Sequence, residues 1–219
     1  MTAVYFEHRA DAGRRLADRL VLLISEHSIV CALPRGGVPI GFVVASILKL
    51  PLTVIVSRKL GYPPQPEFGI GAIAEANVCV LNNSTIARLN VTKADLAHII
   101  QDEKQELRRR VLTYRRGKRL ALKGKDVILV DDGIATGVTM KAAVKALRKY
   151  NVKSILCAVP VSSPSAAREL KALVDRFISL YTPHDFGPVS KHYRSFTQTT
   201  DKEVCAALLA IPCAHSYNE

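Results

Sequence analysis

A short segment that runs from an apolar strand through two acidic residues into a turn of small residues constrains this chain most. Residues 127–130 are Val, Ile, Leu and Val, and such an unbroken apolar run predicts a strand buried on both faces of a parallel sheet. Asp131 and Asp132 follow at its carboxyl end, where ligands collect in such sheets. Small residues then open the next helix, so that main-chain N–H groups can close on an anion. The segment predicts an α/β fold with its site at this edge.

The turn offers more polar groups than an ordinary strand-to-helix connection needs. Thr136 and Thr139 add hydroxyl donors to the amides that Gly133 and Gly137 leave accessible. A simpler interpretation is an Asp N-cap on a common loop, but a cap uses one carboxylate and one hydroxyl rather than two of each. Paired carboxylates beside a phosphate-sized loop suit a sugar phosphate. The segment therefore predicts a site for a ribose 5-phosphate.

The order strand, acid pair, Thr-Gly-x-Thr loop and helix resembles the motif that binds 5-phosphoribosyl 1-pyrophosphate (PRPP) in type I phosphoribosyltransferases. The resemblance implies that Asp131 and Asp132 are catalytic: they hold the ribose hydroxyls, offset the positive charge that develops on the sugar and reach a metal ion through water. It also implies that the turn binds the 5-phosphate of PRPP through Gly133, Ala135, Thr136, Gly137, Val138 and Thr139. The implied fold is a parallel twisted sheet flanked by helices, with a flexible flap hairpin and a small C-terminal hood.

A second apolar strand, residues 29–33, ends in a glycine-rich turn before a helical stretch at 38–49. Taken alone, this pattern indicates only a turn. In the family that the chain resembles, this position is the pyrophosphate loop, often with a strained or cis peptide. The resemblance then implies that Arg35, Gly36 and Gly37 contact the PRPP diphosphate.

A third strand, residues 52–56, leads to two adjacent cations, Arg58 and Lys59. Cations at a strand end suit an anionic substrate, although two solvated charges are an equally good interpretation of the pair alone. The Arg-Lys-x-Gly sequence resembles the third substrate segment of adenine phosphoribosyltransferases, which implies that Lys59, with Arg58, reaches the pyrophosphate and that Lys59 is catalytic. Residues 58–82 would form a flap loop and hairpin that excludes water.

Within that flap, residues 69–74 fit a loose dinucleotide-binding pattern, Gly-x-Gly-x-x-Ala. No strand precedes the pattern and no helix follows it, so it is a weak signal, and we predict a hairpin over residues 69–82. The surrounding sequence resembles an uncharacterised branch of the transferases. By that resemblance Glu67 and Glu75 are candidate site acids.

After the main motif, alternating strands and helices are expected up to residue 180. Residues 182–200 are polar and aromatic and would form the hood beside the sheet. Phe186, Val189 and Tyr193 could wall a flat ring and make the base pocket, and packing of this tail onto the core is the alternative. We expect Asp201 to cap a last helix.

The composition indicates one domain over residues 1–219, because 48% of the residues are apolar and nothing separates two halves. The apolar stretch at 20–33 is broken by Glu26 and His27, so neither a membrane span nor a signal peptide is expected, and the protein is expected to be cytoplasmic. Its five cysteines include no Cys-x-x-Cys, which argues against a disulfide framework or a zinc knuckle.

The positive charge is concentrated in one stretch. Residues 104–125 hold ten Lys or Arg against a single acid, Glu106, which is +9 of the total +12. The first half of the stretch lies in a predicted helix at 93–115 with one apolar side. The plain interpretation is a solvated helix face near a homo-oligomer contact. Electrostatic steering of PRPP comes next, and nucleic-acid binding last, because no stacking-aromatic motif accompanies the charge.

Together, the resemblances imply an enzyme of nucleotide metabolism that transfers the 5-phosphoribosyl group from PRPP to a nucleobase-like acceptor, releases pyrophosphate and uses Mg2+. In 6-oxopurine transferases the residue before the loop threonine is an Asp that serves the purine N7. Here it is Ala135, so we expect another acceptor. A PRPP-sensing regulator without turnover is the alternative, against which Arg35 and Lys59 favour the enzyme, and a nucleotide-binding subunit of a larger complex is a third.

Overall fold

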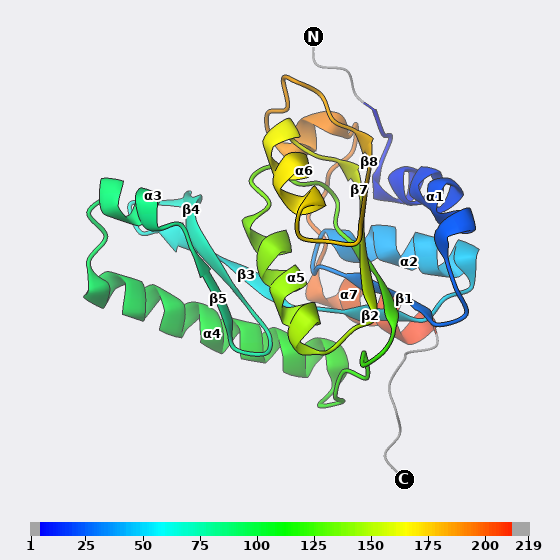
Figure 1. Ribbon diagram of the computed structural model, residues 1–219, viewed down its shortest axis with the longest axis horizontal. Coiled ribbons are helices and arrows are strands. Elements are labelled where there is room, and N and C mark those ends of the chain that lie inside the picture. Colours follow the sequence, from blue (N-terminus) through cyan, green and yellow to red (C-terminus); the bar gives the residue numbers. More distant parts are fainter. Residues whose placement is uncertain (1–4, 212–219) are drawn as a thin grey trace.

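The computed structural model describes residues 5–211, apart from the side chains of residues 66 and 67. A parallel sheet forms its centre, with the strand order β2-β1-β6-β7-β8 (Figure 1). In chain order these strands are β1 (Ser28–Ala32), β2 (Leu52–Val54), β6 (Asp126–Val130), β7 (Ser154–Val161) and β8 (Arg176–Tyr181). Each neighbouring pair is parallel. The α/β fold expected from the sequence is confirmed.

Helices cover both faces of this sheet (Figure 1). One face carries α1 (Arg9–Leu20), α2 (Gly37–Leu48) and α7 (Asp201–Ala210), and the other carries α5 (Val138–Lys149) and α6 (Pro164–Lys171). Alternate strand residues point to opposite faces, so Val30 and Ile128 join the first core, whereas Ile29 and Leu129 join the second. The apolar run before the acid pair is therefore buried on both sides, as predicted.

A smaller antiparallel sheet extends from the end of β2 (Figure 1). It consists of β3 (Ser57–Tyr62), β4 (Gln65–Ala74) and β5 (Val78–Leu81) in the order β3-β4-β5. The hairpin expected within residues 69–82 is confirmed as the β4–β5 pair. A short helix, α3 (Asn83–Arg88), follows β5, and a long helix covers the sheet.

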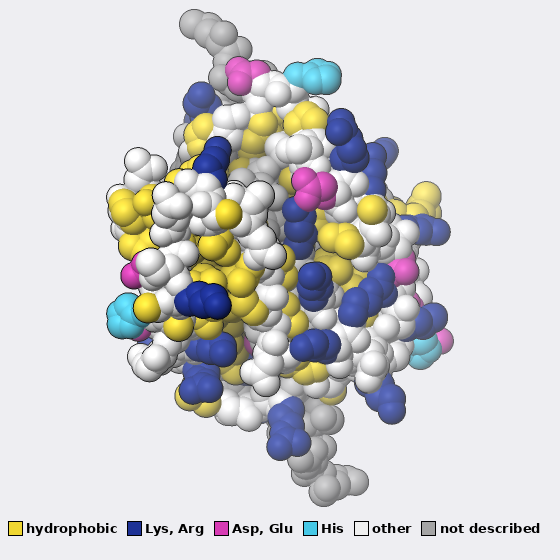
Figure 2. All heavy atoms as spheres, turned by 60° about the vertical axis from the view of Figure 1, so that its left-hand side comes forward, with side chains coloured by type: hydrophobic (Ala, Val, Ile, Leu, Met, Phe, Trp, Pro, Cys, Tyr) yellow, Lys and Arg dark blue, Asp and Glu magenta, His cyan; other side chains and the backbone are white. Residues whose placement is uncertain are grey.

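That long helix, α4 (Lys93–Arg115), has the boundaries expected from its periodicity. Thr92 begins it with a capping box to Asp95, which satisfies two otherwise unpaired amides. Its predicted apolar side, including Ile99 and Ile100, packs on the antiparallel sheet. Lys and Arg side chains outnumber Asp and Glu on the face shown in Figure 2, which brings this end of the molecule forward.

Two features of the helices differ from expectation. Thr200, not Asp201, is the N-cap of α7, because its hydroxyl accepts from the Glu203 amide and the Glu203 carboxylate bonds back. Asp201 is the first helical residue, so its carboxylate is available to other partners. Helix α1 was not predicted from the sequence, since charged residues dominate it and its buried side is mostly Ala and Gly.

The structure also bears on two expectations about the whole chain. Among the described residues, no helix combines the length and apolar character needed to cross a bilayer. Cys31, Cys79, Cys157 and Cys205 are free thiols, and Cys213 lies outside the described residues.

Candidate functional site

Two acidic side chains stand at the carboxyl end of β6, the central strand of the parallel sheet. Asp131 and Asp132 are half-buried, and the Asp132 amide donates to Asp131 Oδ1 at 2.9 Å. Burial raises the pKa of Asp131 well above its usual range, and the negative charge of Asp132 raises it further. Burial also raises the pKa of Asp132, although Arg9 opposes this effect. The pair therefore favours a partner that brings positive charge or hydroxyl donors.

Arg9, the first residue of α1, supplies such a partner from the protein itself. Its Nε and Nη2 donate to Asp132 Oδ2 at 3.0 and 2.8 Å, and its Nη1 donates to the carbonyl oxygen of Thr197 at 2.6 Å. The guanidinium carbon lies 3.8 Å from the centre of the Phe196 ring. Sequence reasoning missed Arg9 because no motif surrounds it and 123 positions separate it from Asp132.

The glycine-rich loop after β1 comes so close to the acid pair that side chains are excluded. A Cβ atom at Gly36 would lie 2.0 Å from Asp132 Oδ2, and one at Gly37 would lie 2.7 Å from the carbonyl oxygen of Val130. The loops meet because β1 and β6 are adjacent parallel strands that end at the same edge. The two segments expected to bind one ligand are therefore in direct contact.

The turn between β6 and α5 is held in place by the end of β7. The Ile134 amide donates to the last residue of β7 at 2.9 Å, and the Ser163 hydroxyl donates to the carbonyl oxygen of Ala135 at 2.6 Å. Gly137 adopts a left-handed φ of 72° and provides no side-chain cap for α5. The free N–H groups at the start of α5, beside the exposed Thr136, can bind an anion. The other predicted residues of the turn are half-buried beside it: Gly133, Val138 and Thr139.

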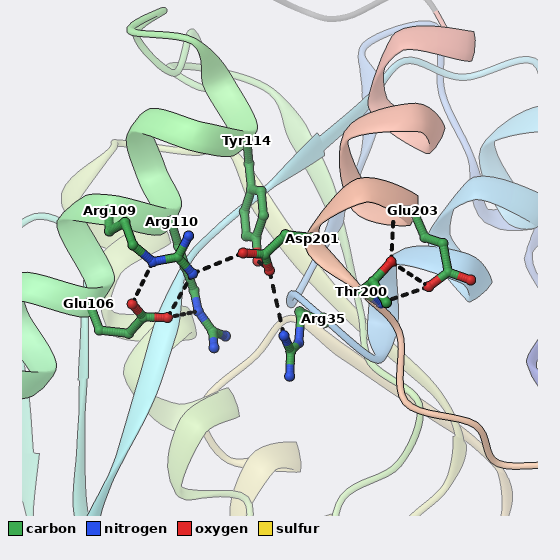
Figure 3. A network of polar contacts seen from close by, with 8 residues as sticks. All are labelled: Arg35, Glu106, Arg109, Arg110, Tyr114, Thr200, Asp201 and Glu203. Carbon is green, nitrogen blue, oxygen red and sulfur yellow. Dashed lines mark hydrogen bonds and ion pairs between the residues drawn. The ribbon is translucent and has the colours of Figure 1, made fainter.

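Arg35, in the loop after β1, points into a polar network shown in Figure 3. The Pro34–Arg35 peptide bond is cis, and Arg35 Nη1 lies 3.6 Å from Asp201 Oδ1. The Tyr114 hydroxyl donates to the same oxygen at 2.6 Å, and Arg109 Nη2 donates to Asp201 Oδ2 at 2.9 Å. Arg35 is therefore linked to α4 and α7 through one carboxylate that sequence reasoning had assigned only as a cap.

Arg58 and Lys59, adjacent on β3, face different parts of the molecule. Arg58 Nε donates to Glu103 Oε2 on α4 at 2.6 Å. Lys59 lies toward α5, because a Cβ atom at Gly69 would be 3.3 Å from the Lys59 side chain and 4.0 Å from Val138 Cγ1. The structure therefore places Lys59 toward the start of α5 and Arg58 against α4.

The hood segment meets the site through its aromatic side chains. The Tyr193 hydroxyl donates to the carbonyl oxygen of Asp132 at 2.6 Å, and Phe186 and Tyr193 are both buried. Val189 lies over the turn, since a Cβ atom at Gly133 would be 2.6 Å from its Cγ1. Phe186 and Tyr193 thus pack on the core, which was the alternative to a ring pocket. Contact of any of the three with a base stays a prediction.

Glu75 is not placed where the resemblance suggested. Its carboxylate accepts from the Val56 amide at 2.8 Å, pairs with buried Arg115 and accepts from the Tyr150 hydroxyl. Tyr150 follows the carboxyl end of α5, whereas the acid pair and the turn at residues 133–137 precede its amino end. Glu75 therefore lies away from the acid pair, and its assignment as a site acid is wrong. The side chain of Glu67 lies outside the described part of the chain.

The arrangement can bind a ligand that has hydroxyls and phosphates a few ångströms apart. Nowhere in the described part of the chain do three His, Cys, Asp or Glu side chains gather around one point. Asp131 and Asp132 are the candidates to hold a hydrated divalent cation, an ion that commonly keeps several waters and binds one or two carboxylates.

Known proteins are similar to this chain in sequence and in fold. The profile of a family described as “Phosphoribosyl transferase domain” matches residues 5–194. Two Mycobacterium tuberculosis proteins (strains CDC 1551 and H37Rv), each named a “Putative phosphoribosyl transferase”, are 43% identical over 204 residues, or 93% of this chain and 46% of the relative. The chain thus spans about half the length of these relatives. The crystal structure of TT1426 from Thermus thermophilus is 39% identical, covers 94% of this chain and 98% of its own, and superposes with a TM-score of 0.77.

The contact between Gly36 and Asp132 predicts a context-dependent effect of Gly36→Ala. The added methyl group must displace the carboxylate from Arg9, which we expect to lower the free energy of unfolding by about 1–3 kcal/mol. In an Asp132→Ala background the same substitution should cost clearly less, because the colliding oxygens are gone. Urea unfolding of the four proteins of this double-mutant cycle measures the difference. Equal costs in both backgrounds would contradict the contact.

The raised pKa of Asp131 predicts that this carboxylate destabilises the protein. A group whose pKa is higher in the folded than in the unfolded state holds its proton more tightly when folded, so stability falls as the pH rises from about 3.8 through the folded pKa. Asp131→Asn removes this charge and keeps the acceptor for the Asp132 amide. We expect it to stabilise the protein at neutral pH and to lose that advantage below about pH 3.8. Urea unfolding between neutral pH and pH values below about 3.8 measures the effect, with the exposed Asp18→Asn as control. The same change in the free energy of unfolding in both variants at every pH would contradict the prediction.

Proposed function

The chain belongs to the phosphoribosyl transferase domain family, and we propose that it transfers the 5-phosphoribosyl group of PRPP to a nitrogenous base with release of pyrophosphate. The observation that carries the proposal is the contact between the loop after β1 and the acid pair after β6. A ribose bound at the acid pair would have its 1-position beside that loop. Both ends of one PRPP molecule can then be held together.

In this proposal each loop has one part of PRPP to bind. The carboxylates of Asp131 and Asp132 accept from the ribose hydroxyls, and the uncapped amides before α5, with Thr136, bind the 5-phosphate. The loop of Arg35, Gly36 and Gly37 contacts the diphosphate, and the Gly36 amide is its main-chain donor, because the Gly37 amide already donates to the Leu33 carbonyl oxygen. Lys59 approaches from the flap. Holding the reacting groups in line lowers the entropic part of the barrier, and the carboxylates offset the positive charge that develops on the sugar.

Mg2+ is the cofactor implied by the family, and the donor set fits it. Asp131 and Asp132 are adjacent carboxylates whose burial raises both pKa values, so a cation nearby would favour their ionised forms. When bound, the ion would neutralise charge on the leaving diphosphate. The two carboxylates would orient its water ligands.

The acceptor is proposed not to be a 6-oxopurine. Ala135 is exposed in the turn at residues 133–139 that we propose binds the 5-phosphate, called the phosphate turn below. It carries no carboxylate that could accept a hydrogen bond from a purine N7. Its carbonyl oxygen is already bonded to the Ser163 hydroxyl. Val189, which lies over Gly133, is the hood residue best placed to contact a ring.

A regulator that binds PRPP without turnover is the second candidate. Asp132 is paired with Arg9, and Arg35 lies against Asp201. Substrate that used either group would have to replace these internal partners. If PRPP does not displace Arg9 and Asp201 from these pairs, the protein would bind the 5-phosphate of PRPP and leave its diphosphate unreacted.

Pyrophosphate release distinguishes the two candidates. The protein is incubated with PRPP and Mg2+ and a panel of purine, pyrimidine and other nitrogen-heterocycle acceptors. We expect PRPP-dependent pyrophosphate release with at least one acceptor and none above background with hypoxanthine or guanine, because the N7 partner is missing. Turnover of either 6-oxopurine at rates typical of enzymes would refute the acceptor assignment. Tight PRPP binding without release for any acceptor would favour the regulator.

Substitution of the acid pair tests the ribose role. Asp131→Asn with Asp132→Asn should leave the fold intact and abolish the rise in melting temperature that PRPP and Mg2+ produce, because amides accept poorly from hydroxyls that carboxylates bind well. Stabilisation by a ligand at a hundred times its Kd is about 2.7 kcal/mol, so its loss is measurable. Asp18→Asn with Asp102→Asn removes the same charge at exposed positions and should keep the effect. A full shift in the acid-pair variant would rule out the role.

A further inference from the structure

A groove between α4 and the turn that joins β4 to β5 lies away from the proposed PRPP site. Its volume is about 470 Å3, within the roughly 300–1,000 Å3 of typical small-molecule pockets. Tyr150, just beyond the carboxyl end of α5, lines it. The phosphate turn precedes the amino end of the same helix, whose 12 residues span about 18 Å. The two sites are therefore separate.

The groove carries more positive than negative charge. Lys104 and Arg108, one turn apart on α4, line it and are exposed. Arg115 lines it from the end of the same helix, and the acid in the lining is Glu75, which pairs with Arg115. The ion pairs found within residues 5–211 do not include Lys104 or Arg108. Two cations are thus left for an anion from outside.

Arg115 adds a buried positive charge to the wall of the groove. The residue is only 6% exposed, and its Nε is buried without a hydrogen-bond partner. Glu75 does not accept from that donor; its oxygens accept from Arg115 Nη2, the Val56 amide and the Tyr150 hydroxyl. An unpaired buried donor on a guanidinium is unfavourable. The guanidinium itself lines the groove and so places a third positive charge beside any anion bound there.

Most of the remaining residues that line the groove are apolar. Leu107, Val111 and Leu112 contribute from α4, and Ile73 and Val78 contribute from the hairpin. Leu112 is 63% exposed at present. Figure 2 shows the same mixture over this side of the molecule, with hydrophobic side chains exposed among Lys and Arg. An inorganic anion would leave these walls uncovered, whereas a ligand with an apolar body would bury them.

We propose that the groove is a second ligand site, which binds a small phosphate ester that carries an apolar or aromatic group. The phosphate oxygens accept from Lys104 and Arg108, because charged donors bind phosphate well, and the buried charge of Arg115 lies beside them. The organic group covers Leu107 and Leu112. Because β4 runs from this groove toward the flap, a ligand here contacts the sheet that carries Lys59.

A tryptophan placed in the groove tests the proposal locally, since the chain has no other tryptophan. Leu112→Trp at this exposed position reports on the groove and not on the phosphate turn. Titration with AMP as the probe should give a saturable change in emission. Lys104→Ala with Arg108→Ala should weaken it at least about tenfold, whereas Arg119→Ala with Lys123→Ala removes equal charge outside the groove lining and should leave it nearly unchanged.

Two further arms separate this site from the proposed PRPP site and from a simple anion site. Asp131→Asn with Asp132→Asn, in the Leu112→Trp protein, should retain the response, whatever the fate of the enzymatic proposal. Calorimetry of the acid-pair variant without the reporter should show AMP binding that Lys104→Ala with Arg108→Ala removes. Inorganic phosphate should bind more weakly than AMP. No saturable response, equal loss in both cation variants, or equal affinity for phosphate and AMP would overturn the proposal.

Discussion

The site depends on the close approach of two loops at the carboxyl ends of β1 and β6. Asp132 is the point at which they meet: Gly36 lies against its carboxylate, Arg9 donates to that carboxylate, and Tyr193 donates to its carbonyl oxygen. These contacts come from the loop after β1, from the first helix and from the hood segment. Asp132 therefore contacts three parts of the chain that are distant in sequence. The parallel sheet positions these parts around it.

Two of the charged groups of the site have partners of opposite charge within the protein. Asp132 pairs with Arg9, and Arg35 lies near Asp201, which also accepts from Tyr114 and Arg109. A substrate that binds these groups exchanges one set of partners for another, so its affinity is the difference between two sets of contacts. Burial of the acid pair favours the binding of a cation or of hydroxyl donors, because an ionised carboxylate that lacks a partner is unfavourable in a buried position.

The basic stretch shows how a charge count in the sequence becomes several different structural roles. Arg109 and Arg110 pair with Glu106 on the same helix, and Arg109 also reaches Asp201. Arg115 is buried against Glu75, which lies in the turn between β4 and β5. The remaining cations of α4 face the groove or solvent. The charge therefore serves local pairing, the support of Arg35 and a candidate anion site, rather than one continuous surface.

The sequence by itself determined the parts that depend on local pattern. The apolar run before Asp131, the small-residue turn and the periodicity of residues 93–115 specify a buried strand, a tight turn that opens a helix and a long helix, because backbone geometry and alternation act over a few residues. Tertiary structure alone decided that Arg9 reaches Asp132, that Asp201 supports Arg35, and that Glu75 pairs with Arg115. Each of these partners is distant along the chain and carries no motif, so only the packing of the helices on the sheets brings their charges together.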